Sequence, residues 1–192
     1  MGTPLAKRDP SFEPVRVHGD FQREHPDAEA SATEVTLNLT LAGTLTINRV
    51  DELLAQYGLV LKGFNVLAVV AGATEALTPT AIADRTVVGK TTVTAVLDAL
   101  ERRQLVLRRP HPVSRRSVLV EVTPEGRQAC DEILARLHVL EAQWLADMPE
   151  ADRQTLLRLL GEARGLFSRA QVPPRPASAV HEQDEKGTGH GG

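Results

Sequence analysis

The chain has 192 residues, of which 42% are hydrophobic but only 3% aromatic, and its net charge is −3. This length suits one ordinary domain, or two small ones that share a core. With so few aromatic residues the core must consist of Leu, Val and Ala, which favours helices packed on helices over a β-sandwich.

A single cysteine, Cys130, excludes an internal disulfide framework and suits a reducing compartment. No apolar run is long enough to span a membrane, and no apolar segment follows Lys7 and Arg8 as in a secretory signal. We therefore expect a cytoplasmic protein.

The two ends of the chain differ in composition from its middle. Residues 1–30 are rich in Pro and single charges with no helical period, and residues 172–192 are rich in Pro and Gly. Such segments cannot bury enough apolar surface to pack. We expect a disordered or loosely attached N-terminal arm over 1–30, a disordered C-terminal tail over 172–192, and a folded domain over 31–171.

The first folded segment is ambiguous between helix and strand. VTLNLTL, from Val35 to Leu41, alternates like a strand and its threonines lower helix propensity, whereas Leu45, Val50 and Leu53 have helical spacing. We predict one long helix, because no turn signal precedes Tyr57-Gly58. Gly58 fits the residue in the left-handed conformation that ends many helices.

The next elements follow the order helix, helix, turn, helix, strand, strand, helix, helix. Thr78-Pro79 and Thr123-Pro124 each supply an N-cap residue and a proline in the first helical position. We predict helices over Leu61–Val70, Pro79–Arg85, Lys90–Arg103, Pro124–Ala146 and Glu150–Ala170, a turn over Thr86–Gly89, and strands over Leu105–Arg109 and Ser117–Thr123. The predicted fold class is mainly α with a small β wing, that is, a winged helix-turn-helix plus a helical dimerisation domain.

Positive charge is concentrated in this central region. The segment from Arg85 to Arg116 has eight basic and two acidic residues, while the segments before and after it are acidic. Such a run of charges is often only a solvated surface. DNA binding, however, depends on the local charge of the contact surface more than on the net charge of the chain. On a strand, tip and returning strand after a helix-turn-helix, we read it as a DNA-binding surface.

The helix over Lys90–Arg103 has the side chains that major-groove reading requires. Short polar residues near its start can approach base edges while long basic residues hold phosphates, and Val93, Val96, Leu97 and Leu100 form its buried stripe. Arginines at a wing tip suit a narrow minor groove. The DNA-binding residues that we predict are Lys90, Thr91, Thr92, Thr94, Arg109, Arg115 and Arg116.

These motifs resemble the MarR family of bacterial transcriptional regulators. The specific matches are TVTAVLDALERRQLV, a wing with paired arginines, and the Thr-x-x-Gly opening of the next helix, and the likeness extends over residues 32–170. The resemblance implies a homodimer with a winged helix at about 59–123 and dimerisation helices at about 31–57 and 124–170. It also implies that Lys90–Arg103 is the recognition helix, that Arg116 is the wing arginine, and that a small molecule can act as effector.

Three positions depart from the family pattern. Ser114 stands where an Asp usually braces the wing arginine, Gln104 stands where Gly usually follows the recognition helix, and Gly89 replaces a Ser N-cap. A non-glycine residue in the left-handed conformation costs on the order of 1 kcal/mol. We therefore expect a local difference at Gln104 and a slightly weaker start of the recognition helix.

The function that we predict is a sequence-specific, ligand-responsive homodimeric repressor that binds a pseudopalindromic operator in double-stranded DNA. The alternative is a winged-helix module that binds protein and not DNA, which Ser114 and the acidic net charge favour. The sequence has no phosphate-binding loop, nucleophile elbow or clustered metal ligands, so we expect neither an enzyme nor a cofactor or metal. Cys130 is read as a small buried hydrophobic residue, with an oxidant-sensing thiol as the alternative.

Overall fold

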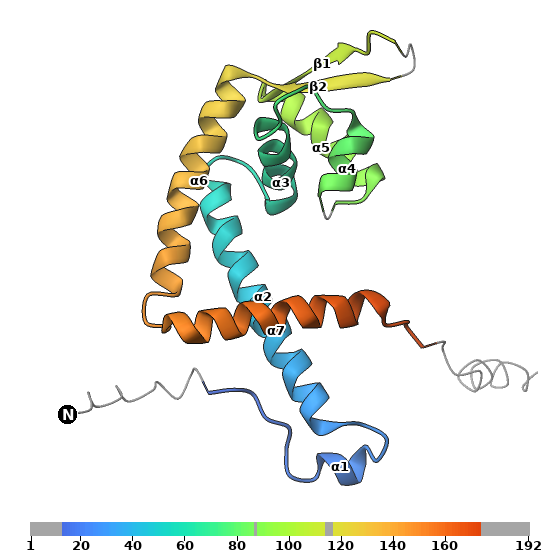
Figure 1. The fold of residues 1–192 in the computed structure, drawn as a ribbon, viewed down its shortest axis with the longest axis vertical. Coiled ribbons are helices and arrows are strands. Elements are labelled where there is room, and N and C mark those ends of the chain that lie inside the picture. The colour runs from blue at the N-terminus through green and yellow to red at the C-terminus, as the bar shows by residue number, and fades with distance from the viewer. Residues whose placement is uncertain (1–12, 87, 114–116, 174–192) are drawn as a thin grey trace, which may run out of the picture. The chain divides into compact units, whose positions relative to one another are not determined.

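The computed structural model describes residues 13–86, 88–113 and 117–173. The chain divides into two compact units between Gln143 and Trp144, and the long final helix lies in the second. The elements in chain order are α1 (Phe21–Glu24), α2 (Ala30–Ala55), α3 (Leu61–Ala71), α4 (Pro79–Arg85), α5 (Lys90–Arg102), β1 (Val106–Pro110), β2 (Val118–Val122), α6 (Pro124–Trp144) and α7 (Glu150–Arg169) (Figure 1).

The segment with strand-like alternation is part of one long helix, α2, as predicted. Its threonines direct their hydroxyl groups back to the helix itself: Thr36 donates to the carbonyl of Ala32, and Thr40 donates to that of Thr36, both at 2.8 Å. The helix therefore satisfies the groups that lower its propensity. Only its last turns are buried, at Val50, Leu53 and Leu54.

Gly58 ends this helix in the predicted way. Its φ is 61°, and the backbone amides of Gly58 and Leu59 donate to the carbonyls of Ala55 and Leu54 at 2.9 and 3.0 Å. These two bonds are those of a Schellman motif. The carboxylate of Asp51 then accepts from the backbone amide of Leu61 at 2.8 Å and so caps the next helix, α3.

Residues 13–30 differ from the expectation of a loose arm. Val15 makes two backbone hydrogen bonds with the Asn38 side chain, both 2.9 Å, and Arg16 pairs with Glu34 at 2.6 Å. The arm therefore lies along the first turns of α2. Composition hides this attachment, because it depends on two polar side chains spaced one helical turn apart. Residues 1–12 and 174–192 lie outside the described residues, so disorder there stays a prediction.

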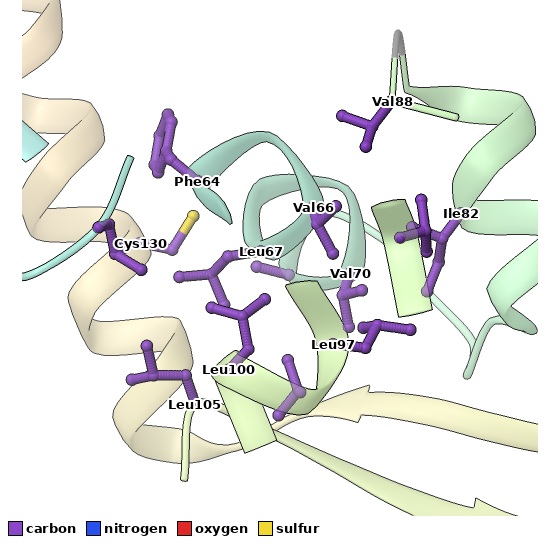
Figure 2. Close-up of a cluster of buried hydrophobic side chains, with 14 of the residues drawn as sticks. Phe64, Val66, Leu67, Val70, Ile82, Val88, Leu97, Leu100, Leu105 and Cys130 are labelled. Carbon is purple, nitrogen blue, oxygen red and sulfur yellow. The ribbon is translucent and has the colours of Figure 1, made fainter. Parts of the chain in front are cut away.

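The winged helix has its own core. Helices α3, α4 and α5 pack together beneath the antiparallel hairpin of β1 and β2, in which Arg108 faces Val120 (Figure 1). Side chains from α3, α4, α5 and α6 converge in one cluster that includes Phe64, Ile82, Leu97 and Cys130 (Figure 2). The predicted cap at Thr78 forms, since its hydroxyl accepts from the amide of Ala81 at 3.2 Å.

A close backbone contact joins the hairpin to α6. The Thr123 hydroxyl donates to the carbonyl of Gln104 at 2.7 Å and accepts from the amide of Gly126 at 2.9 Å. A Cβ on Gly126 would lie 1.9 Å from the carbonyl oxygen of Leu105. The glycine in the Thr-x-x-Gly motif is therefore required by packing, because no side chain fits between α6 and the backbone of Leu105.

Candidate nucleic-acid interface

Helix α5 exposes the side that the sequence predicts. Lys90, Thr91 and Thr94 are exposed and Thr92 is half-buried. On the opposite side Val93, Leu97 and Leu100 are at most 1% exposed, while Val96 is only half-buried. The first turn of α5 thus presents one ammonium and two hydroxyl groups outward, held in place by a well-packed apolar face.

The start of α5 lacks a side-chain cap, as the Gly89 departure predicts. Gly89 is the N-cap with φ −63° and ψ 153°, and its residue type offers no side-chain acceptor for the first amides. Free amides and the positive end of the helix dipole favour a negatively charged group at this point. Lys90, in the first helical position, adds a full positive charge beside them.

Arg108 is occupied within the protein. Its guanidinium pairs with Asp98 at 2.6 Å and with Glu101 at 2.9 Å, and its side chain is 23% exposed. Its backbone amide also donates to Glu101 at 3.2 Å. Arg108 therefore fixes the base of the wing to the recognition helix, and its single positive charge offsets one of the two carboxylate charges of α5.

Arg109, a predicted DNA contact, is exposed but paired. Its Nε lies 3.0 Å from a carboxylate oxygen of Glu121 on the neighbouring strand, and its side chain is 62% exposed. Exposed pairs of this kind contribute little stability and exchange readily. The arrangement keeps the side chain on the wing without burying it, so its role at DNA stays a prediction.

The wing tip was predicted to carry two further contacts, Arg115 and Arg116, with Ser114 as the departure beside them. These three positions lie outside the described residues. The strands that lead to the tip are in register up to Pro110, which faces Val118.

The turn before the wing is formed by Gln104 in the left-handed conformation, with φ 59°. The amides of Gln104 and Leu105 donate to the carbonyls of Glu101 and Leu100 at 2.8 and 3.0 Å. A Schellman motif thus forms even without the usual glycine. The local difference is strain at one residue and not a different turn.

Arg85 and Arg103 are two arginines that the sequence did not single out. Arg85 is exposed in the last turn of α4, directly before the turn that leads to Lys90. Arg103 donates from Nη1 to the carbonyl of Gly58 at 2.7 Å and from Nη2 to the carbonyl of Tyr57. The signal for Arg85 was its place at a helix end beside the turn, whereas nothing in the sequence showed the distant partner of Arg103.

Cys130 is buried, 2% exposed, among the core residues of α6. Burial, with a smaller contribution from Asp131, raises the pKa of its thiol, and Arg127 opposes this only in part. A raised pKa keeps the sulfur protonated and weakly nucleophilic. The structure therefore favours the apolar core interpretation over an oxidant-sensing thiol.

Two depressions lie in the first unit. An apolar one of about 160 Å³ lies between the α2–α3 turn and α5 and is lined by Leu59, Val60, Val96 and Leu100. A more polar one of about 280 Å³ is lined by Glu75, Glu121 and Arg127.

Over the described residues, His, Cys, Asp and Glu form no group of three or more that could hold a metal ion. In that same part of the chain no helix is long and apolar enough to cross a membrane.

Comparison with known proteins finds a matching family model and similar regulators. A model of the MarR family matches residues 71–118. The chain is 27% identical over 143 residues to the HTH-type transcriptional regulator PecS of Dickeya dadantii (strain 3937). This alignment covers 73% of the chain and 86% of PecS. It is 25% identical over 164 residues to the HTH-type transcriptional repressor YetL of Bacillus subtilis (strain 168), covering 85% of this chain and 95% of YetL.

Solved structures agree in fold. A mutant MarR from E. coli, complexed with operator DNA, superposes with a TM-score of 0.60 at 21% identity and covers 74% of this chain and 96% of that one. This likeness confirms the winged-helix fold class. The relatives are transcriptional regulators and not enzymes. The winged helix of this chain therefore matches the MarR family model, and the similar curated proteins are transcriptional regulators.

Proposed function

We propose that this regulator binds operator DNA with α5 in the major groove. The observation that carries the proposal is the first turn of α5. Lys90, Thr91 and Thr94 are exposed at an uncapped helix start, and the opposite side of the helix buries Val93, Leu97 and Leu100. Hydroxyl groups reach base edges from such a position, and the ammonium and free amides suit the flanking phosphates. Thr92, half-buried, suits a phosphate better than a base.

The wing supplies the second part of the proposed interface. Arg109 contacts a phosphate after exchanging its exposed pairing with Glu121, and Arg115 and Arg116 enter the minor groove next to the site that α5 reads. Arg85 adds a phosphate contact from the end of α4. The positive charge of the region supports this arrangement, because Arg108 pairs with both acidic residues of α5 and offsets one of their two charges.

We propose that the protein acts as a homodimer on a pseudopalindromic site. Large apolar side chains remain exposed on α2 at Val35 and Leu45, and on α7 at Leu157 and Leu166, each at least 61% exposed. Exposed apolar surface of this extent on a helix is typical of a protein–protein interface. Two-fold symmetry then presents two copies of α5 to half-sites about one helical turn apart.

We further propose that the regulator is a repressor that a small molecule releases. The name of YetL, a repressor, supports the direction of regulation. Release requires that the effector bind the free form more tightly than the DNA-bound form. The alternative of a protein-binding winged helix is less favoured, since the first turn of α5 presents polar groups and no apolar patch.

The test is selection of duplexes from a random pool with the full-length chain, followed by footprinting. We expect one protected site with two-fold symmetry. Thr91→Ala should relax base preference at one position of each half-site, whereas Lys90→Ala and Arg85→Ala should weaken binding about equally on all duplexes. If no duplex is enriched and no site is protected, the protein-binding alternative is favoured instead.

A further inference from the structure

The turn at Tyr57-Gly58 is held by arginines from two other elements. From the end of α5, Arg103 donates to the carbonyls of both turn residues. From α6, Arg136 donates to the Gln56 side chain at 2.7 Å and to the Tyr57 hydroxyl at 3.2 Å. The guanidinium carbon of Arg136 also lies 5.5 Å from the centre of the Tyr57 ring. The turn at the end of α2 is therefore linked by side chains to the recognition helix and to α6.

The geometry of the turn matches the shape of a guanidinium. Two successive carbonyls accept from the two terminal nitrogens of Arg103, which fixes the direction of that side chain as well as its distance. Gly58 suits this arrangement because its φ of 61° is a backbone conformation that residues with a Cβ rarely adopt. A lysine at position 103 would present one ammonium nitrogen instead of two nitrogens held in a plane.

Apolar packing alone does not fix α5 at this end. The helix packs mainly against α3, α4 and β1. Beside Arg103, the apolar depression of about 160 Å³ leaves space between Val96 and Leu100 of α5 and Leu59 and Val60 of the turn. A helix with such a gap beside it can tilt at little cost in packing. The hydrogen bonds of Arg103 therefore limit the tilt of α5 relative to α2.

We propose that Arg103 and Arg136 are positioning residues for DNA recognition. Through the Tyr57-Gly58 turn they set the angle of the recognition helix relative to α2 and α6, and hence the distance between the two recognition helices of a dimer. This inference rests on the proposed function, in which α5 reads DNA and α2 contributes to the dimer. Neither arginine touches DNA in this proposal. Each acts through the turn.

The test measures spacing preference and not affinity alone. The probes are the duplex selected by the parent protein, and two versions of it with one base pair added or removed between the half-sites. We expect the parent to prefer the native spacing. Arg103→Ala should lower the ratio of affinities for native and altered spacing about ten-fold, and Arg103→Lys should retain part of that ratio. Arg102→Ala is the matched control, because it removes the same charge from an exposed neighbour. It should keep the preference.

A second variant keeps the inference testable if Arg103→Ala fails to fold. Arg136→Met retains an unbranched side chain but loses both hydrogen bonds and the guanidinium beside the Tyr57 ring, and it should reduce the spacing preference in the same direction. A lower melting temperature with unchanged preference would show a merely structural role and overturn the inference. A uniform loss on all three probes and on poly(dI-dC) would show a phosphate contact and overturn it too. If the parent selects no duplex, the proposed function fails first and this inference with it.

Discussion

At the scale of single residues, three positions have environments that decide their identity. Gly58 and Gln104 both take a positive φ, at 61° and 59°. Gly126 has no such constraint but lies against the backbone of Leu105, the residue before β1. Local sequence patterns predicted the conformation of Gly58, and the family resemblance pointed to Gln104. They could only match Gly126 to a motif, because its reason is a contact with Leu105, distant in the chain.

Gly126→Ala should destabilise the protein by about 3 kcal/mol or more, since a Cβ 1.9 Å from the carbonyl oxygen of Leu105 forces the backbone to move. Urea unfolding measures the effect. Gly161→Ala is the control: it also lies inside a helix, with nothing within 4 Å of its Cβ, and should stabilise by up to about 1 kcal/mol. Equal free energies of unfolding for the two variants would contradict the packing argument.

Gln104→Gly should stabilise the protein by roughly 1 kcal/mol, because glycine adopts the left-handed conformation without the steric cost that other residues pay. Gln104→Ala is the matched variant and should bring no gain, since alanine keeps the Cβ. Thermal unfolding of both variants beside the parent gives the comparison. A gain with alanine as large as that with glycine would place the strain elsewhere.

At the scale of elements, the order of helices and strands was predictable and the contacts between them were not. Cap residues, prolines and apolar spacing located the elements from α2 to α7 within a few residues, because those signals act over one helical turn. The short helix α1 was not predicted. The attachment of residues 13–17 to α2 was missed, since Glu34 and Asn38 look like ordinary surface residues of a helix. Arg108 and Arg103 were counted with the surface charge because their partners lie on other elements. Arg108 pairs with side chains of α5, and Arg103 donates to backbone carbonyls at the end of α2.

The attachment of the N-terminal segment to α2 should depend on pH. Hydrogen bonds from Arg16 and from the amide of Val17 hold the pKa of Glu34 below the ordinary carboxyl value of 4.5. A lowered folded-state pKa means that the contribution of these contacts is complete above about pH 4.5 and is lost as the pH falls through the lowered pKa. Hydrogen exchange should show protection of the Val17 amide at pH 6 that disappears in stronger acid.

Glu34→Gln provides the control for this effect. The amide cannot titrate in the range, so residual protection at Val17 should be the same across the acid range. Protection that falls equally in the parent and in this variant would assign the pH dependence to another group.

At the scale of the whole molecule, exposed apolar surface is the feature that a single chain leaves unexplained. Helix α7 has no buried residue, and Leu157, Leu166 and Phe167 are each more than half exposed. The sequence predicted α7 as a helix, and the family resemblance implied that it belongs to a dimerisation domain. Composition could not identify the partner surface, because self-association depends on shape as well as on apolar area.

Leu157→Glu combined with Leu166→Glu should shift the protein from dimer to monomer, because it places two charges on apolar positions that the dimer is proposed to bury. Sedimentation equilibrium measures the mass against the 20.8 kDa of one chain. Ser168→Glu adds a charge at a polar exposed site of the same helix and should leave the mass unchanged. A monomeric parent would contradict the proposed homodimer.

The short backbone bridge between Leu77 and Val120 has a consequence for solubility. The two residues exchange amide-to-carbonyl hydrogen bonds of 3.0 and 2.8 Å, so the side of β2 away from β1 is covered at its centre. The remaining free edge is β1, which carries Arg108 and Arg109 and ends in Pro110, a residue without an amide hydrogen. Charges and proline discourage a strand of another molecule from adding to such an edge. The wing can therefore extend from the protein as an isolated hairpin without nucleating aggregation between neighbouring molecules.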